Sequence, residues 1–273
     1  MTSGITVVMA VRNGEATLRL ALESLLDQTL PPERIVVIDD GSTDATVEVA
    51  EAVGQRRPGT IMVRSQPNAG FAAALRGAVT FVDTEFVAIA DADDWHVPQR
   101  LERSLSLMLE SGADMVGGQV TGRLGGRLRL APSRFPTAPS AIARRVSAGL
   151  DPLPHITMMV RRDGLDRFGS YRDLRRAADL ELMLRWAHRG ARLAVSPDVF
   201  AVYSFRPEFF SVEAQTRWMI CTRYAREIAL LPDGDVQDFA QWFSGQRLGP
   251  SRREAVQRVA RLTARLGVGM LQR

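Results

Sequence analysis

The chain has 273 residues, of which 45% are hydrophobic and 24% are charged. This composition is typical of a globular protein and excludes a long disordered chain, a collagen-like fibre and a disulfide-rich scaffold. The one cysteine, Cys221, cannot form an internal disulfide, which favours a reducing cytoplasm. No apolar run approaches the roughly 20 residues of a membrane-spanning helix, and we expect no signal peptide at residues 5–11, which lack a basic leader and a cleavage site.

The charge of the chain is concentrated at one end. The net charge is +4, from 31 acidic residues and 35 basic ones, all of which are arginines. A chain without lysine cannot use a lysine-dependent phosphate loop or Schiff-base chemistry. Within residues 250–273, six arginines and the single Glu254 give a charge of +5. The rest of the chain is nearly neutral, which argues against nucleic acid as a partner.

Apolar runs alternate with amphipathic segments along the first 120 residues. The apolar runs are typical of strands buried on both faces, and we expect them at 5–11, 34–40, 60–65, 85–90 and 114–120. The amphipathic segments have helical spacing, and we expect helices at 15–28, 42–53, 70–81 and 97–110. This alternation predicts an α/β fold with a Rossmann-like, mainly parallel central sheet flanked by helices.

The alternation weakens beyond residue 120. Residues 121–155 are rich in Gly, Pro, Ser and Arg and predict an excursion or loops over the sheet. The following segments predict a strand at 156–160, a helix at 177–188 and a short strand at 192–195. From residue 212 onward we expect the chain to be helical to its end.

The end of the chain predicts a basic amphipathic helix. Apolar residues recur there at helical spacing, at Ala255, Val259, Leu262, Leu266 and Met270. Such a helix can lie on an anionic membrane, or it can pack against the protein with its arginines in solvent. We therefore expect a main domain over residues 1–210 and a C-terminal helical extension over residues 211–273.

Polar clusters follow three of the predicted strands. They are Arg12-Asn13-Gly14, Asp39-Asp40-Gly41-Ser42 and Asp91-Ala92-Asp93-Asp94. In an open parallel sheet, ligands bind outside the carboxyl ends of the strands. We therefore expect the three clusters to converge on one binding site.

The aspartates after the fourth strand suggest a metal site. Asp91 and Asp93 offer two hard oxygen ligands that suit Mg²⁺ or Mn²⁺, with phosphate oxygens and water completing the octahedron. Such an ion would stabilise a diphosphate leaving group. In the alternative interpretation, Asp93 or Asp94 merely caps the helix near Pro98.

Asp40 has a functional and a structural interpretation. At the tip of its strand, its carboxylate could accept hydrogen bonds from a nucleobase or a ribose. Alternatively, the segment only makes a turn at Gly41, and Ser42 or Thr43 caps the next helix. Both interpretations can hold at once, because they use different residues.

Several ordered segments between residues 4 and 205 resemble the inverting glycosyltransferases of family two, which have the GT-A nucleotide-diphospho-sugar transferase fold. The segments are ITVVMAVRNG, SLLDQT, IVVIDDGSTDAT, QPNAGFAAALRGAV, FVAIADADDWHVPQRLE, RFGSYRD and AADLELMLRWAHRG.

The resemblance implies a role for individual residues. Asp93 would bind Mn²⁺ or Mg²⁺, Asp91 would contact the ribose or assist the metal, and Asp179 would be the general base. The nucleotide would be held by Ala10, Val11, Arg12, Asn13, Asp40, Asn68, Arg76, Asp91 and Ala92.

The chain departs from the family pattern in several places. Ala10 and Arg12 stand where the family usually has a proline and an aromatic residue. Arg76 replaces a common Asn, and Ala178 replaces the Glu that often precedes the base. Glu181 is a rival base, but two residues along a helix amount to about 200°, so only one of Glu181 and Asp179 can face a cleft.

The implied activity is transfer of a sugar from a nucleotide-diphosphate donor, such as a UDP-sugar, to a hydroxyl of a glycan or lipid-linked acceptor. The resemblance places this reaction in the synthesis of cell-envelope polysaccharides, in the cytoplasm or peripherally at the inner face of the cell membrane. Trp95, His96 and His155 are candidates for the acceptor side, or else structural residues. The alternative function is a non-catalytic relative that binds a partner or a membrane surface. A nucleotidyltransferase is disfavoured because its phosphate site would need lysine.

Overall fold

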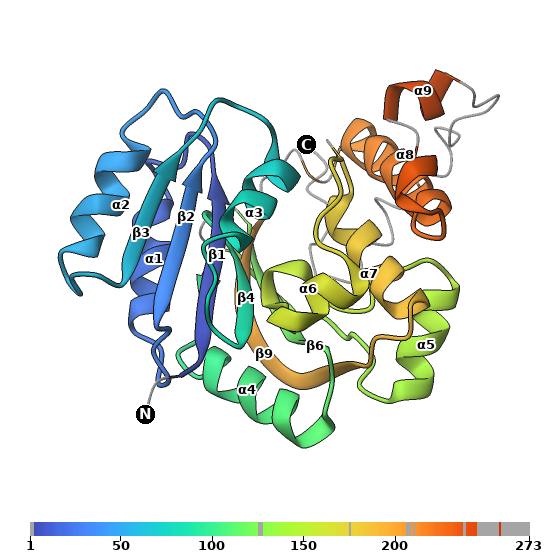
Figure 1. The fold of residues 1–273 in the computed structure, drawn as a ribbon, viewed down its shortest axis with the longest axis horizontal. Helices are drawn as coiled ribbons and strands as arrows, with labels where there is room; N and C mark the ends of the chain where they lie inside the picture. Colours follow the sequence, from blue (N-terminus) through green and yellow to red (C-terminus); the bar gives the residue numbers. More distant parts are fainter. Residues whose placement is uncertain are drawn as a thin grey trace.

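The computed structural model describes residues 3–124, 128–174, 176–205, 209, 211–236, 239–244 and 257. In this part of the chain the strands form one nine-stranded sheet in the order β3-β2-β1-β4-β8-β6-β9-β5, with β7 on β6 (Figure 1). The strands are β1 (Ile5–Val11), β2 (Arg34–Asp39), β3 (Ile61–Ser65), β4 (Phe86–Asp91), β5 (Trp95–His96), β6 (Met115–Leu124), β7 (Leu128–Leu130), β8 (Met159–Arg161) and β9 (Leu193–Phe205).

Helices cover both faces of this sheet. The α-helices are α1 (Leu18–Leu26), α2 (Thr46–Gly54), α3 (Phe71–Val79), α4 (Arg100–Ser111), α5 (Pro139–Ser147), α6 (Arg162–Phe168), α7 (Ala178–His188), α8 (Val212–Ile228) and α9 (Phe239–Ser244). Two short 3-10 helices are η1 (His155–Thr157) and η3 (Asp233–Asp235).

The strands β3, β2, β1 and β4 are all parallel. In the centre, Ala10 of β1 lies opposite Ile38 of β2 and Asp91 of β4. The carboxyl ends of these strands therefore open at the same edge of the sheet, where α/β proteins bind ligands. The four strands and four helices predicted up to residue 111 are confirmed, with ends that differ by a few residues.

Beyond β4 the sheet is mixed. The strand β8 pairs antiparallel with both β4 and β6, and β5 pairs antiparallel with β9, whereas β6 and β9 are parallel. The prediction of an α/β fold with a central sheet flanked by helices is confirmed. The antiparallel strands are an addition that the alternation of the first 120 residues did not indicate.

Alternate residues of β1 face opposite helical layers, as the pleat of a strand requires. Val7 and Met9 pack with buried side chains of α1, α2 and α4. Val8 packs with those of α3, α6 and α7 on the other face. All three side chains are fully buried, which explains why the strand sequence is apolar throughout.

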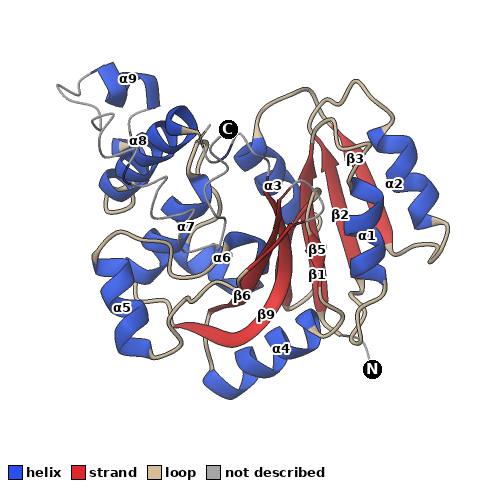
Figure 2. Cartoon of the chain, turned by 180° about the vertical axis from the view of Figure 1, so that it is seen from behind, coloured by secondary structure: helices blue, strands red, loops and turns tan. Residues whose placement is uncertain are grey.

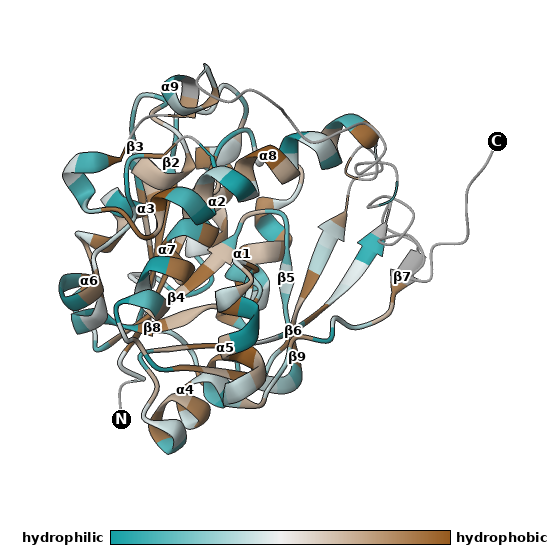
Figure 3. Ribbon diagram, turned by 90° about the vertical axis from the view of Figure 1, so that its right-hand side faces the viewer, coloured by the Kyte–Doolittle hydropathy of each residue, from teal (hydrophilic) through white to brown (hydrophobic). Residues whose placement is uncertain are grey.

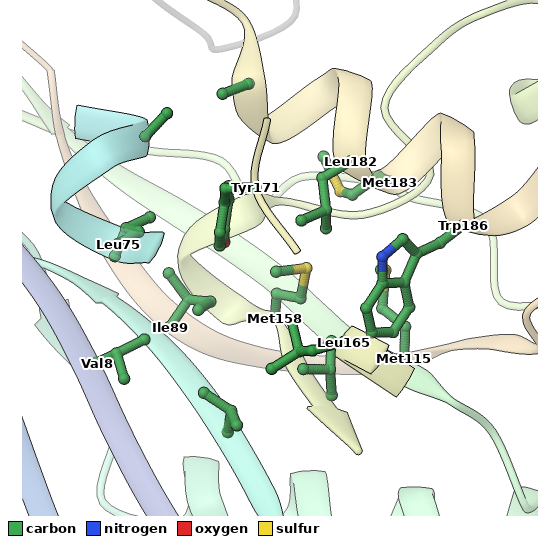
Figure 4. Packing of buried hydrophobic residues seen from close by; sticks show 14 of the residues in the cluster. Val8, Leu75, Ile89, Met115, Met158, Leu165, Tyr171, Leu182, Met183 and Trp186 are labelled. Atoms are coloured by element: carbon green, nitrogen blue, oxygen red, sulfur yellow. The ribbon is translucent and has the colours of Figure 1, made fainter. Parts of the chain in front are cut away.

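The core on the α7 side fixes the position of that helix. Figure 4 shows Trp186 of α7 beside Met158 and Leu165, with Ile89 of β4 further along the same cluster. Trp186 is fully buried, and its indole N–H donates to the carbonyl of Gly169 over 2.8 Å. Each such apolar side chain contributes about 1.5–3 kcal/mol on burial. These contacts hold α7 on this face of the sheet.

A bulge bends the long pair β6 and β9, whose curvature is visible in Figure 2. Gly117 pairs with Val195 and Gln119 pairs with Val199, so the three residues 196–198 of β9 stand opposite the single residue Gly118 of β6. The predicted short strand at 192–195 is therefore wrong in its extent, since β9 runs for 13 residues. Its polar, proline-containing middle looks like a turn but forms the bulge, and the paired ends of both strands project past β5 (Figure 3).

The predictions for residues 121–155 and for the C-terminal segment need correction. The described part of 121–155 contains the end of β6, β7 and helix α5, so it is more regular than expected. The helix expected from residue 212 ends at Ile228, and η3 follows after Pro232. Proline cannot donate the backbone hydrogen bond that a helix needs, which explains the interruption. The predicted basic helix at residues 255–270 lies outside the described residues apart from Gln257.

In the described part of the chain, no helix combines the length and the apolar character needed to cross a bilayer.

Candidate active site

Side chains tie together the loops that follow β1 and β2. Asn13 has the left-handed φ of +51° that asparagine tolerates better than most residues. Its Oδ1 accepts from the Thr43 N–H over 2.9 Å, and its own N–H donates to Ser42 Oγ over 2.8 Å. The Gly14 N–H donates to Thr46 Oγ1 over 2.8 Å. Two of the three predicted polar clusters are thus brought together, with Asn13 as the link.

Asp40 is a buried organiser of the next loop. Its Oδ1 accepts from Gln66 Nε2 and from the Ala69 N–H, and its Oδ2 accepts from the Gly70 N–H, each over 2.8 Å. These bonds hold the segment that precedes α3, and the carboxylate is only 5% exposed. The nucleobase contact of Asp40 stays a prediction, because all of its observed partners belong to the chain itself.

The remaining predicted donor-binding residues lie around this loop. Gly41 has a φ of +74°, and a side chain there would lie 3.0 Å from the backbone nitrogen of Asn68, so glycine is required. Arg12 and Asn68 are exposed. Arg76 lies 3.9 Å from Asp173 in an exposed ion pair. These positions are compatible with ligand contact, and their roles stay predictions.

The aspartates after β4 do not cap a helix. The residue before α4 is Gln99, and no side chain caps that helix end. Asp94 is buried, and its Oδ1 accepts from the backbone N–H of Ser204 over 2.7 Å, which ties the loop to the end of β9. Asp91 ends β4 with its Oδ1 buried and without a hydrogen-bond partner in the described residues.

These carboxylates lie in an environment that opposes negative charge. Burial, with the nearby charges of Asp93 and Asp179, raises the pKa of Asp91 to about 7. Burial and the Asp91 charge raise the pKa of Asp94 to about 8. Arg100 is the compensating cation, and burial lowers its own pKa to about 9. One buried guanidinium therefore faces two carboxylates, those of Asp91 and Asp94, and a divalent cation would add positive charge at this site.

The residues present fit a metal ion that is shared with a ligand. No group of three or more His, Cys, Asp or Glu side chains within the described residues is arranged to hold a metal by itself. Asp91 and Asp93 supply two carboxylates from this loop, and the buried Oδ1 of Asp91 has no other described partner. Mg²⁺ and Mn²⁺ are commonly bound by one or two carboxylates together with phosphate oxygens of the substrate.

Asp93 and Asp179 line the same pocket, which has a volume of about 1070 Å³. Asp179 lies in the first turn of α7, two residues after Ala177, whose φ of +53° is unusual for a residue with a side chain. Such conformations cluster at functional sites. The charge of Asp179 also acts on Asp91 and on the buried phenol of Tyr171. The α7 carboxylate and the loop after β4 therefore form one site.

Glu181 faces away from this pocket. Its side chain is fully buried, and its Oε1 lies 2.7 Å from Arg185 Nε and 2.9 Å from a terminal nitrogen of Arg172. Of the two rival carboxylates of α7, only Asp179 lines the pocket.

The histidine candidates for the acceptor side are buried elsewhere. His155 Nε2 lies 2.7 Å from the Tyr171 hydroxyl, and the ring packs edge-on against Phe71. His96 is fully buried, with its Nδ1 2.8 Å from a guanidinium nitrogen of Arg100. Neither histidine lines the pocket, and a role for them on the acceptor side stays a prediction.

Much of the pocket wall was absent from the sequence predictions. This wall includes Tyr203, Ser204 and Phe205 at the end of β9 and Ala214, Trp218 and Cys221 on α8. The last three recur at helical spacing on one face of α8, which was the available signal. That spacing alone is equally typical of a face packed against the core.

The strand edge, the carboxylate loop and the facing α7 together enclose the pocket that Asp93 and Asp179 line. A model of the family described as glycosyl transferase family 2 matches residues 6–169, and the chain belongs to that family. The matched region includes the loops after β1, β2 and β4 but ends before α7.

Curated relatives agree with this assignment. The chain is 28% identical over 204 residues to the putative glycosyltransferase EpsE of Bacillus subtilis, and the match covers 70% of each protein. It is 34% identical over 104 residues to the putative glycosyltransferase EpsH of the same organism, which covers 38% of this chain and 30% of EpsH.

Solved glycosyltransferase structures share the fold. TarS residues 1–349 from S. aureus in complex with UDP have a TM-score of 0.63 at 23% identity, over 86% of this chain and 68% of that one. The mannosyltransferase PcManGT from Pyrobaculum calidifontis, in complex with GDP-Man and Mn²⁺, has a TM-score of 0.64 at 18% identity, over 98% of this chain and 76% of that one. The predicted GT-A architecture is thereby confirmed.

Proposed function

We propose that this glycosyltransferase is metal-dependent and inverting, and that it transfers a sugar from a nucleotide diphosphate to an acceptor hydroxyl with Asp179 as the general base. The observation that carries the proposal is that Asp179 and Asp93 line one pocket, at the carboxyl edge of the parallel strands. A donor bound at that edge would present its anomeric carbon toward α7.

The donor-binding residues in this proposal are those of the strand ends. The linked loops of Asn13 and Asp40 would hold the nucleoside, beside Ala10 in β1. The other contacts would come from Val11, Arg12, Asn68, Arg76, Asp91 and Ala92. A UDP-sugar is supported by the fold shared with TarS, for which complexes with UDP and UDP-GlcNAc are known. The GDP-Man complex of PcManGT makes GDP-sugars the second class to test.

Asp93 and Asp91 would hold the Mn²⁺ or Mg²⁺ ion. The support is the buried, unpartnered Oδ1 of Asp91 and its raised pKa, together with the Mn²⁺ found in PcManGT. When bound, the ion would disperse the negative charge that develops on the diphosphate leaving group.

Asp179 would remove the proton of the acceptor hydroxyl as that oxygen attacks the anomeric carbon. The attacking oxygen approaches from the side opposite the leaving diphosphate, so the anomeric configuration inverts. A positioned base contributes about 10²–10⁴-fold in rate. The carboxylate is partly exposed at the pocket wall, where it can reach an incoming hydroxyl.

The direct test is turnover of UDP-GlcNAc and GDP-Man by the full chain with Mn²⁺. We expect release of nucleoside diphosphate from one of these donors, and a product of inverted anomeric configuration by NMR. If tight nucleotide binding occurs without any turnover of a broad donor panel, the chain is instead a non-catalytic binding protein.

The metal role has a separate test in binding. We expect Asp93→Ala to lose the Mn²⁺-dependent part of UDP affinity in calorimetry, while Asp166→Ala, at an exposed site of α6, keeps it. If Mn²⁺ raises the UDP affinity of Asp93→Ala as much as that of Asp166→Ala, the assignment of Asp93 as a metal ligand is wrong.

We propose a glycan or lipid-linked acceptor in polysaccharide synthesis for the cell envelope, used in the cytoplasm. Two similar proteins support this, a succinoglycan biosynthesis protein and a poly(ribitol-phosphate) beta-glucosyltransferase.

The basic residues 250–273 would contact an anionic inner membrane surface peripherally. Co-sedimentation with anionic liposomes at physiological salt tests this contact, and its loss in a chain that ends at residue 249 is expected.

A further inference from the structure

One guanidinium joins the helix that carries Asp179 to the end of α8. Arg172 precedes α7, and its side chain is 9% exposed. It donates to the carbonyl of Ile228, the last residue of α8, over 2.8 Å and to that of Leu231 over 2.6 Å. Two further bonds of 2.9 and 2.6 Å go from its Nε and a terminal nitrogen to Asp233 Oδ1. Arg172 therefore caps the carboxyl end of α8, where the helix dipole favours a cation.

The same guanidinium reaches the first turns of α7. Glu181 is fully buried, forms an ion pair with Arg172 over 2.9 Å and accepts a hydrogen bond from Arg185 over 2.7 Å. Arg185 also donates to the carbonyls of Phe168 and Ser170, over 2.6 and 2.8 Å. The buried carboxylate is thus compensated twice, and removal of Arg172 leaves it paired with Arg185.

This network connects the two walls of the pocket. Asp179 lies two residues before Glu181 on one wall, and Trp218 and Cys221 of α8 lie on the other. Nothing in the network lines the pocket itself, because Arg172, Glu181 and Asp233 are all absent from its lining. Their effect on a reaction there must pass through the positions of α7 and α8.

We propose that Arg172 is a positioning residue for the transfer reaction: by bonding Glu181, the end of α8 and Asp233 at once, it sets the distance and angle between Asp179 and the α8 wall. This inference rests on the proposed function, since it assigns Arg172 a role in the same site. A displacement of about 1 Å of a catalytic group can cost about 100-fold in rate.

The test compares four variants of the full chain. Arg172→Met keeps the stem of the side chain and removes every hydrogen bond, whereas Arg172→Lys keeps the charge. Asp233→Ala removes only the exposed end of the network, since the Asp233 side chain is 71% exposed. Asp235→Ala is the matched control, an exposed aspartate in the same 3-10 turn.

The turnover rate is measured with the donor that the wild type uses. It is divided by the concentration of UDP- or GDP-binding sites, so that only folded protein is counted. We expect kcat to fall about 10- to 100-fold in Arg172→Met and a few-fold in Asp233→Ala, with unchanged nucleotide Kd. Arg172→Lys should recover part of the loss, and Asp235→Ala should match the wild type. A wild-type kcat in Arg172→Met, or a change in KM alone, would overturn the proposal even if the melting temperature fell.

Hydrogen exchange separates this inference from the proposed function. We expect faster amide exchange at residues 178–182 and at the end of α8 in Arg172→Met and Asp233→Ala, but not in Asp235→Ala. If the wild type turns over no donor, the proposed function fails while this exchange result still decides whether the network holds α7. Should Arg172→Met not fold, Asp233→Ala and Arg172→Lys give the same comparison, and unchanged exchange in both would refute the network's role.

Discussion

Three aspartates of the site, Asp40, Asp91 and Asp179, have carboxyl groups that lie in three different environments. Asp40 has both oxygens bonded to the loop that precedes α3. Asp91 has a buried, unpartnered oxygen and a pKa raised to about 7 by burial and by neighbouring carboxylates. Asp179 lies at the pocket wall. The roles proposed for them, a metal ligand for Asp91 and a base for Asp179, therefore belong to carboxyl groups with different surroundings.

At the scale of the residue, Asp179→Asn should separate catalysis from binding. The amide has the same shape but cannot accept the proton of an acceptor hydroxyl, so we expect kcat to fall by about 10²–10⁴-fold. Nucleotide affinity, measured by calorimetry, should stay within twofold of the wild type. Asp166→Asn, at an exposed position of α6, serves as the matched control. Full activity of Asp179→Asn would remove the base assignment.

The burial of His155 predicts that the stability of the folded state depends on pH. Burial lowers the pKa of His155 below its ordinary 6.5, although the charge of Asp179 acts in the opposite direction. Below that ordinary value the unfolded chain binds a proton that the folded chain does not, so this residue reduces stability as the pH falls. The loss ends at the lowered pKa of the folded state.

The variant His155→Gln should lose this contribution while keeping a polar partner for Tyr171. The difference in unfolding free energy between wild type and variant should change by up to about 1.4 kcal/mol for each pH unit below about 6.5. Urea unfolding at about pH 5, 6 and 8 measures it. Asp91 and Asp94 have raised pKa values and therefore stabilise the fold as the pH falls. Because both proteins contain them, their contribution cancels in the difference, which leaves that of His155. Parallel pH profiles would contradict the expectation.

At the scale of the element, the bent pair β6 and β9 brings the end of β9 to the site. The bulge at residues 196–198 lets β9 continue to Phe205. Its end then supplies the Ser204 N–H that fixes Asp94, and the Tyr203 side chain at the pocket wall. A bulge in a strand thus positions parts of a site that lie more than 100 residues apart in sequence.

Gly118 lies at the register shift of β6 and packs directly against the ring of Phe200. A methyl group at that position would lie 2.5 Å from the ring of Phe200, which is fully buried and cannot withdraw. We expect Gly118→Ala to lower the unfolding free energy by about 1–3 kcal/mol, measured by urea denaturation. Gly54→Ala is the control, since its methyl group would find an ordinary contact at 3.6 Å at the end of α2. Equal stability of both variants would show that the strands relax without cost.

At the scale of the whole molecule, the pocket exists only between separate layers. The α7 wall rests on one face of the sheet through Trp186 and Leu182, the strand ends supply Asp93, and α8 closes the far side. Ligand that bridges these parts should stabilise all of them together.

We therefore expect UDP with Mn²⁺ to raise the melting temperature more than UDP alone. At about 100 times the Kd, binding adds about 2.7 kcal/mol, which corresponds to about 5 °C for a chain of this size. A thermal-shift assay checks this, with EDTA expected to remove the metal-dependent part. Asp93→Ala should show only the shift of UDP alone, and an equal response to Mn²⁺ in that variant would exclude Asp93 as a ligand.

The sequence alone was sufficient for the parallel half of the fold. The runs around Val7 and Ile38 are apolar because both faces of the strand are buried, so their local pattern predicts their structure. The helix around Leu22 follows from apolar spacing in the same way. The polar clusters at the strand ends were predictable too, because parallel strands bring their carboxyl ends to one edge.

Only the tertiary structure decided the features that depend on distant partners. Ser196 to Asp198 look like a turn until β6 pairs on both sides of them. Glu181 and Asp179 are equivalent carboxylates on one helix until Arg172 and Arg185 bury the first and the pocket exposes the second. Local patterns record the repeat of a helix or strand, whereas burial, bulges and ion pairs are set by residues that come together only when the chain has folded.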